Sequence, residues 1–256
     1  MDNGSIEYHC IILAAGCGSR MRELGTDIPK CLLSINSRTL LESHLDNLIK
    51  YPISDVTIVV GFKKDKIIDK IGSTYKNLRI KYVESNEYSS TNHGWSLFLT
   101  NQVIRDNRQS VLIVHADNYY DPKLLSALIE SPYEDVILVD PHFSIKTNDE
   151  LMVIGDNGVV GGLRYIYEKS GGYLGEFIGL HKWSQRFGLR FVDYLEDYFK
   201  IHGKNEGYDW LIGRFIEESK IELNYLLIDD RKWINVNHED DYLYAKELSE
   251  GFLDYT

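Results

Sequence analysis

A continuous apolar segment that runs directly into a glycine-rich loop most restricts how this chain can fold. Residues 8–14 read YHCIILA, and AGCGSRM follows at 15–21. An unbroken apolar run that ends in small residues predicts a strand buried on both faces of a sheet. Gly16 and Gly18 allow the next turn to bring its backbone close to a ligand. The segment therefore predicts a buried strand with a binding loop at its carboxyl end.

Strands and helices alternate along the first 140 residues. Apolar runs predict further strands at 55–61, 78–84, 110–117 and 135–140. Leucine spacing, and a proline at a first-turn position, predict helices at 39–50, 64–71, 94–105 and 122–130. This alternation predicts an α/β fold, a Rossmann-like three-layer sandwich with a mainly parallel central sheet.

The pattern changes after residue 141. Asp156-Asn157-Gly158 lies between two apolar runs within 151–167, which predicts a hairpin and a small antiparallel subregion. The remaining segments predict strands at 175–183, 223–229 and 233–237, and helices at 184–201, 208–219 and 239–250. No linker or repeat interrupts the 256 residues, so we expect one domain. We expect this domain to divide into two parts at about residue 140 and to end in a closing helix at 238–250.

Composition excludes several classes of function. The formal net charge of −11 argues against a nucleic-acid partner, which needs a basic surface. No apolar run reaches the length of a membrane span, and the polar start has no leader pattern, so we expect a cytoplasmic protein without a membrane partner. The three cysteines lack metal-site spacing. The eight histidines show no ligand cluster, and His115, inside a strand, is expected in the core.

Two cations follow the glycine-rich loop. Arg20 offers a planar fork of donors and Lys30 a mobile point charge, while successive loop amides can cradle phosphate oxygens. The Walker pattern is absent, and the dinucleotide fingerprint fails because Met21 replaces its third glycine. The segment therefore predicts a pocket for a nucleoside triphosphate of another type.

The motif LAAGCGSRM at 13–21, followed by PKCLL at 29–33, resembles the signature of nucleotidyltransferases that join an NTP to a phosphorylated small molecule. This family includes sugar-1-phosphate nucleotidyltransferases and the choline-phosphate, inositol-phosphate and phosphonate cytidylyltransferases. The resemblance covers essentially the whole chain. It implies that the part up to about residue 140 binds nucleotide and that 141–237 bind the acceptor. It assigns nucleotide contacts to Leu13, Ala14, Ala15, Gly16, Gly18, Ser19, Arg20 and Ala116.

The resemblance also implies a metal site. Asp117, in VHADNYYD, corresponds to the family's Mg²⁺ ligand, and it ends a strand at the sheet edge where ligands bind. The family's second, late carboxylate is replaced here by asparagine in WINVNHEDD. An amide oxygen can coordinate Mg²⁺, so Asn237 is the expected ligand and Asn235 a second candidate. Alternatively, Asn237 caps the helix that follows.

Base and acceptor selection are read from two segments. SNEYSSTNHGWSLFL at 85–99 resembles choline-phosphate and phosphonate cytidylyltransferases, which favours CTP. Thr91 and Asn92 could read a pyrimidine edge, or cap the helix near residue 94. GEFIGL at 175–180 resembles the phosphonate type, which implies that Glu176 binds the acceptor. Further acceptor candidates are Lys30, Tyr165 and Asp209, with Glu206 and the aromatic residues Tyr167, Tyr173 and Trp183 nearby.

The sequence thus predicts a Mg²⁺-dependent cytidylyltransferase that transfers CMP from CTP to a small phosphorylated or phosphonate acceptor and releases pyrophosphate. Arg20, Lys30 and Asp117 are its expected catalytic residues, acting by positioning and charge neutralisation. Such an enzyme would serve cell-surface polysaccharide or phosphonate biosynthesis. A sugar-1-phosphate nucleotidyltransferase using UTP, GTP or dTTP, and a non-catalytic nucleotide sensor, remain alternatives. The sequence leaves the oligomeric state open, a homo-oligomer included.

Overall fold

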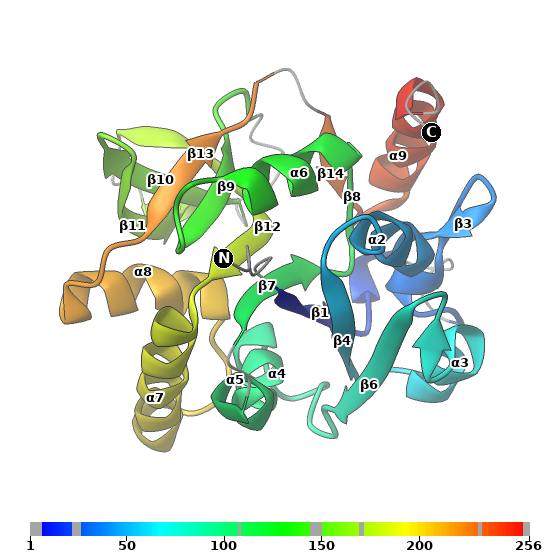
Figure 1. The fold of residues 1–256 in the computed structure, drawn as a ribbon, viewed down its shortest axis with the longest axis horizontal. Coiled ribbons are helices and arrows are strands. Elements are labelled where there is room, and N and C mark those ends of the chain that lie inside the picture. Colours follow the sequence, from blue (N-terminus) through cyan, green and yellow to red (C-terminus); the bar gives the residue numbers. More distant parts are fainter. Residues whose placement is uncertain are drawn as a thin grey trace, which may run out of the picture.

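The computed structural model of the chain describes residues 7–21, 27–106, 109–143, 150–168, 172–229 and 232–252. Within these residues the largest sheet has ten strands, and helices lie on both of its faces (Figure 1). From one edge to the other, the strands are β10 (Leu151–Asp156), β11 (Val159–Tyr165), β13 (Asn224–Leu227), β9 (Val136–Asp140), β12 (Tyr173–Trp183), β7 (Ser110–His115), β1 (Tyr8–Ala14), β4 (Ile53–Val60), β6 (Leu78–Glu84) and β5 (Thr74–Tyr75).

The sheet is mixed rather than mainly parallel. β1 pairs in parallel with β4 and β7, and β4 pairs in parallel with β6. β12 lies antiparallel between β7 and β9, in the middle of the sheet. It follows the β10–β11 hairpin, whose turn has positive φ at Asn157 and Gly158, as expected for this dipeptide. The parallel prediction therefore holds for β1, β4, β6 and β7, whereas the short edge strand β5 pairs antiparallel with β6. After residue 150 short connections reverse the chain direction, and of those strands only β13 pairs in parallel, with β9, among the described residues.

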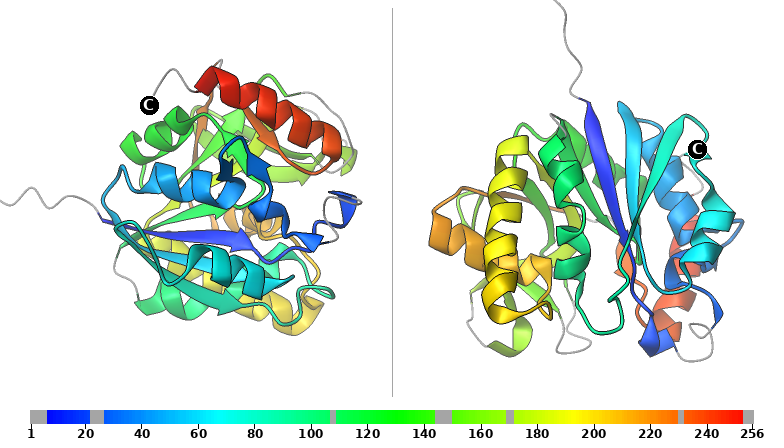
Figure 2. Two further views of the ribbon diagram at one scale, coloured as in Figure 1. Left: turned by 90° about the vertical axis from the view of Figure 1, so that its right-hand side faces the viewer. Right: turned by 90° about the horizontal axis from the view of Figure 1, so that it is seen from below.

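Helices cover the two faces of the sheet and enclose two separate apolar cores. One face carries α2 (Leu40–Leu48), α3 (Lys64–Ile71) and α6 (Pro122–Glu130). The other carries α4 (His93–Phe98), α5 (Asn101–Asp106), α7 (Gln185–His202) and α8 (Tyr208–Ser219). In the right-hand view of Figure 2, α7 and α3 lie on opposite sides of the strands. No helix in the described ranges combines the length and apolar character needed to cross a membrane.

Strand β1 explains why the opening apolar run is unbroken. Cys10 and Ile12 belong to the core under α2, α3 and α6, while Ile11, between them, belongs to the core on the opposite face. All three side chains are fully buried. Because successive side chains of a strand point to opposite faces, a polar residue at any of these positions would enter one core or the other.

Three features differ from the sequence predictions. The helix predicted at 94–105 is interrupted between α4 and α5, where Thr100 Oγ1 donates to the carbonyl of Leu97 and Asn101 Nδ2 to that of Phe98. Such side-chain bonds compete with helix continuation. A short hairpin forms from β2 (Ser34–Ile35) and β3 (Arg38–Thr39). Strand β8 (Asn118–Tyr120) pairs with β14 (Trp233–Asn235), which brings the late segment beside Asp117.

The last helix, α9 (Glu239–Phe252), packs against the segment that follows the glycine-rich loop. It lies beside β14 (Figure 1). A third apolar cluster connects it to the segment after the glycine-rich loop, with members Met21, Leu33, Ile35, Leu40, Ile234, Val236, Ala245 and Leu248. This cluster holds the segment that carries Lys30 against the segment that carries Asn237.

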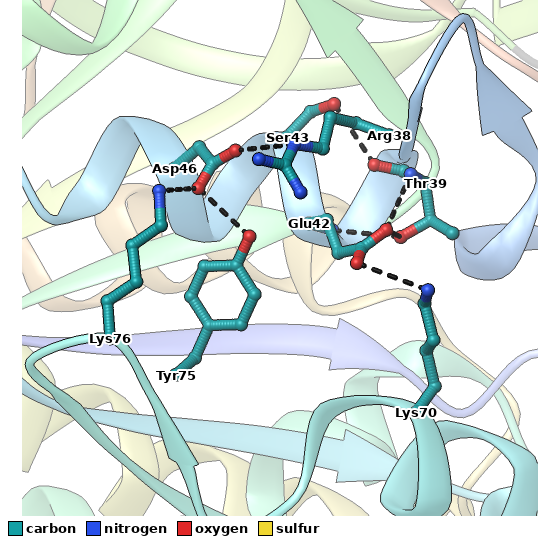
Figure 3. Close-up of polar contacts among 8 residues, drawn as sticks. All are labelled: Arg38, Thr39, Glu42, Ser43, Asp46, Lys70, Tyr75 and Lys76. Atoms are coloured by element: carbon teal, nitrogen blue, oxygen red, sulfur yellow. Dashed lines mark hydrogen bonds and ion pairs between the residues drawn. The ribbon is translucent and has the colours of Figure 1, made fainter.

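Helix α2 is anchored by side-chain contacts at its start and along its surface (Figure 3). Glu42 N–H donates to Thr39 Oγ1 at 3.1 Å and Thr39 N–H donates to Glu42 Oε2 at 2.9 Å, which completes a capping box. Lys70 of α3 lies 3.3 Å from the other oxygen of Glu42. Further along the helix, Asp46 accepts from Tyr75 and Lys76. The helix is thus tied to α3 and to the β5 edge.

Helix α8 approaches β11 closely at a glycine, and this contact predicts an effect on stability. A Cβ at Gly213 would lie 2.7 Å from the backbone nitrogen and oxygen of Leu163. We therefore expect Gly213→Ala to lower the free energy of unfolding by about 1–3 kcal/mol in urea titrations. Gly251→Ala, in α9 with no atom within 4 Å of the added Cβ, is the matched control. It should leave stability unchanged or raise it by up to about 1 kcal/mol; equal stabilities would contradict the packing argument.

Candidate active site

A cavity of about 690 Å³ opens at the carboxyl ends of β1 and β7. In open α/β sheets this edge is where ligands bind. Its walls come from segments spread over the whole chain, and they comprise Leu13, Ala15, Gly16, Cys17, Gly18, Arg20, Lys30, Tyr88, Thr91, Asn92, His93, Ser96, His115, Asp117, Leu151, Tyr165, Tyr167, Glu206, Asp209, Asn235 and Asn237. The glycine-rich loop and both predicted cations therefore share one cavity with Asp117.

Lys30 links two other polar residues that line the cavity. Its Nζ donates to Asp117 Oδ2 at 2.9 Å and to Asn237 Oδ1 at 2.8 Å. Lys30 begins a 3₁₀ turn, Lys30–Leu32, which is anchored by the buried Cys31, and burial raises the pKa of that thiol to about 12. Burial alone would raise the pKa of Asp117, but the Lys30 ammonium and its hydrogen bond hold it below its ordinary value. The carboxylate is therefore charged near neutral pH.

Asp117, Asn237 and Asn235 bring to the cavity side-chain oxygens of a kind that fits a hard divalent cation. Asp117 and Asn237 already share one cation, the Lys30 ammonium. The Oδ1 atom of Asn235 is buried and has no hydrogen-bond partner among the described residues, although the residue lines the same cavity. Carboxylate and amide oxygens are ligands that Mg²⁺ accepts, so these residues could hold such an ion.

The backbone around β8 and α9 explains why the two asparagines reach this position. Val236 N–H donates to the carbonyl of Asp117 at 2.9 Å, next to the β8–β14 pairing. Asp241 accepts from the N–H groups of Asn237 and His238 at the start of α9. Asp241 thus supplies the helix cap, while the Asn237 oxygen turns to Lys30.

The glycine-rich loop adopts the conformation that its sequence requires. Gly18 has φ of +59°, in the left-handed region that favours glycine, and its carbonyl accepts from Met21 N–H at 2.9 Å. A Cβ at Gly16 would meet no atom within 4 Å, so this side of the loop is open. Met21 is buried, and Arg20 beside it lines the cavity. Ser19 belongs to this turn, but its side chain lies outside the described part of the structure.

The predicted nucleotide residues divide into two groups. Leu13, Ala15, Thr91 and Asn92 line the cavity, whereas Ala14 and Ala116 are buried in the core behind it. Asn92 caps α4 through its Oδ1, which accepts from His93 N–H at 2.8 Å, and its Nδ2 donates to the carbonyl of Asn205. Base reading by Asn92 therefore stays a prediction, since its amide already serves the backbone.

Most of the predicted acceptor residues line the cavity, but one of them does not. Tyr165 lines the cavity and stacks on Tyr167, with ring centroids 5.3 Å apart and ring planes 10° apart. Asp209 and Glu206 lie in the same wall. Glu176 does not line the cavity; it lies within β12, paired with Met152 and Asp140.

Two of the aromatic residues that were predicted near the acceptor do not line the cavity. Trp183 is fully buried in the core under α7, and Tyr173 starts β12 away from the cavity wall. These two residues are the first and last of the eleven in β12, so closeness in the sequence did not place them at the cavity.

Two of the histidines, which showed no cluster in the sequence, lie close to an acidic residue in the structure. A ring nitrogen of His93, a ring nitrogen of His115 and a carboxylate oxygen of Asp209 lie within 4.8 Å of one another in the cavity wall. One signal in the sequence could have placed His115 at the cavity. It lies two residues before Asp117 at the end of a strand, and residues i and i+2 of a strand face the same side. The closeness of His93 to Asp209 has no counterpart in the sequence.

The profile of the MobA-like NTP transferase domain matches residues 10–146, which is more than half of the chain. The chain belongs to this family. It is similar to the choline-phosphate cytidylyltransferase of Streptococcus pneumoniae, at 23% identity over 93% of this chain and 96% of the relative. It is also similar to the CTP:phosphoglutamine cytidylyltransferase of Campylobacter jejuni, at 26% identity over 73% and 78% of the two chains.

A solved structure of the Streptococcus pneumoniae CTP:phosphocholine cytidylyltransferase superposes with a TM-score of 0.71, at 21% identity, covering 95% of this chain and all of that one. The comparison shows a shared Rossmann-like α/β fold. Together with the family match, it makes the chain an enzyme of the nucleotidyltransferase class, as the glycine-rich motif predicted.

Proposed function

We propose that the chain is a Mg²⁺-dependent cytidylyltransferase that transfers CMP from CTP to a small phosphorylated or phosphonate acceptor. One observation carries the proposal: Lys30, Asp117 and Asn237 meet in the cavity that the glycine-rich loop and Arg20 also line. The names of the two cytidylyltransferases above support CTP as the nucleotide and a small phosphorylated molecule as the acceptor.

In this reaction an acceptor oxygen attacks the α-phosphorus of CTP in line, forming a new P–O bond while the bond to pyrophosphate breaks. The attacking oxygen is already ionised near neutral pH, so no general base is needed. Arg20 would neutralise charge on the departing pyrophosphate, and Lys30 would hold the acceptor oxygen near the α-phosphate. Mg²⁺, when held by Asp117, Asn237 and Asn235, would neutralise charge on the phosphate oxygens.

The contacts of Lys30 also bear on how a metal ion would bind at this site. Its ammonium is hydrogen-bonded to Asp117 Oδ2 and Asn237 Oδ1, two of the oxygens that a divalent ion would use. An ion held by these oxygens would compete with the ammonium for them. Lys30 would then be held less tightly and would be available to an anionic substrate in the cavity.

Four other residues that line the cavity favour an acceptor with a cationic group. Tyr165 and Tyr167 present stacked rings, and Glu206 and Asp209 add two carboxylates. Aromatic faces and carboxylates both attract a small cation such as an ammonium group. This part of the cavity therefore favours an acceptor that carries an amine or quaternary amine besides its phosphate or phosphonate.

A substrate panel tests the proposal. The purified enzyme is given CTP, UTP, GTP or dTTP with phosphocholine, 2-aminoethylphosphonate or glucose-1-phosphate, and pyrophosphate release is followed. We expect CTP with an amine-bearing acceptor to be the preferred pair, and EDTA to abolish its turnover. Preference for UTP, GTP or dTTP with the sugar phosphate would favour the alternative enzyme, and nucleotide binding without turnover in the panel would favour a sensor.

A further inference from the structure

His93 lies in the cavity wall with its side chain 34% exposed. Its Nδ1 is buried and lacks a partner in the described ranges. Its Nε2 is 3.7 Å from Asp209 Oδ1, which is too long for a hydrogen bond. The imidazole therefore has a ring nitrogen available to a ligand at the cavity.

Asp209 is a nearly buried carboxylate with few counter-charges. Its side chain is 11% exposed. Among the residues whose positions are described, its polar neighbours are the N–H of Trp210, at 2.8 Å, and the Nε2 of His93. The carboxylate lies in the first turn of α8, whose N-terminus stabilises negative charge. No cation donates a hydrogen bond to it among the described residues, so the site also favours a positively charged occupant.

His115 completes the group from a third element. Its ring lies 5.8 Å from that of His93, centroid to centroid, and its Nε2 is 2.6 Å from the Tyr208 hydroxyl. An ion bound at that nitrogen would replace one hydrogen bond, and the hydroxyl remains beside the group. We propose that His93, His115 and Asp209 form a site for a divalent transition-metal ion of the zinc class, distinct from the oxygen site at Asp117 and Asn237.

The histidine site and the oxygen site at Asp117 differ in the chemistry of their ligands. Two imidazole nitrogens and one carboxylate oxygen suit Zn²⁺, Co²⁺ or Ni²⁺, whereas Mg²⁺ prefers oxygen ligands and retains water. Because all three residues line the cavity, a fourth coordination position would face the substrates. The site goes beyond the proposed transferase chemistry. A bound ion would occupy the Asp209 carboxylate, which would leave Glu206 to attract the acceptor's cationic group.

The backbone holds the ligands close together before any ion arrives. Asn92, which precedes His93, donates from its N–H to the carbonyl of Lys204 at 3.0 Å and from its side chain to that of Asn205. A Cβ at Gly94 would lie 2.3 Å from the carbonyl oxygen of Glu206, so α4 and the start of α8 are in direct contact. Rigid placement of this kind reduces the entropy lost on binding.

Metal titration of the chelator-treated full chain, in excess Mg²⁺, tests the site. Calorimetry should show one Zn²⁺ per chain. His93→Ala and Asp209→Asn should each lower the affinity by at least about 10–100-fold. His202→Ala, an exposed histidine of α7, and Asp117→Asn, in the other site, should leave it unchanged. Circular dichroism of each variant checks its fold.

The wild-type protein gives an independent readout if a variant fails to fold. Co²⁺ added in excess Mg²⁺ should produce the intense visible absorption of a four- or five-coordinate ion with imidazole ligands. A weak, six-coordinate spectrum, no Zn²⁺ binding, or affinity unaffected by His93→Ala and Asp209→Asn would each overturn the proposal. Loss of Zn²⁺ binding in Asp117→Asn would likewise overturn it, since zinc would then occupy the oxygen site.

Discussion

Lys30→Ala should lower turnover by about 10²–10³-fold, the range observed when one preorganised charge is removed from a reacting centre. The ammonium of Lys30 is held by Asp117 and Asn237 at the cavity that the glycine-rich loop lines. No other lysine lines this cavity in the part of the chain that the structure describes. Pyrophosphate release at saturating CTP and acceptor measures the effect, and Lys50→Ala, an exposed lysine outside the cavity, is the matched control.

The same variant separates a catalytic role from a structural one. Without the ammonium, the oxygens of Asp117 and Asn237 are free for a metal ion, so the variant should bind Mn²⁺ at least as tightly as the wild type. Thermal melting and circular dichroism check that the fold is retained. A folded Lys30→Ala enzyme with near-normal turnover would remove Lys30 from the mechanism, and weakened Mn²⁺ binding would refute the competition between the two cations.

Asp117→Asn should lower metal-dependent turnover by several orders of magnitude and weaken Mn²⁺ binding. The substitution preserves the shape of the side chain but removes the only charge among the three oxygen donors of Asp117, Asn235 and Asn237. Since charge neutralisation by a bound ion contributes several kcal/mol to such transition states, we expect a decrease of about 10²–10⁴-fold. Mn²⁺ binding is measured by electron paramagnetic resonance and turnover by pyrophosphate release.

Asp121→Asn is the matched control for this experiment. Asp121 lies four residues along the chain, outside the cavity, and caps α6 by accepting from Lys123 N–H. Its loss should leave turnover and Mn²⁺ affinity close to the wild type. If Asp117→Asn bound Mn²⁺ as tightly as the wild type, the ion would have to bind elsewhere, and the assignment of the oxygen site would fail.

The local elements could be predicted because their signals are local. The apolar run of β1, the turn at Asn157 and Gly158, and the helix that starts at Pro122 depend on neighbouring residues alone. Periodicity and turn chemistry are sufficient to predict such elements. The break between α4 and α5 was missed, since it depends on side-chain bonds from Thr100 and Asn101 rather than on hydrophobic spacing.

The candidate site was predictable where a motif carried it. The glycine-rich loop, Arg20, Lys30 and Asp117 lie together in the cavity, as the motif and the strand end suggested. Glu176 was chosen by resemblance of a short segment, yet it lies within β12. The approach of His93 to Asp209 could not be predicted, because it depends on how the start of α4 packs against the start of α8.

The sequence alone determined a doubly buried first strand, a left-handed glycine in the loop after it, and an acidic residue just after β7. Each of these follows from the steric and hydrophobic preferences of adjacent residues. Only the tertiary structure decided that Lys30 meets Asp117, 87 residues away, and Asn237, 207 residues away. Such contacts depend on strand order, on the β8–β14 pairing and on the packing of α9, which the whole chain settles together.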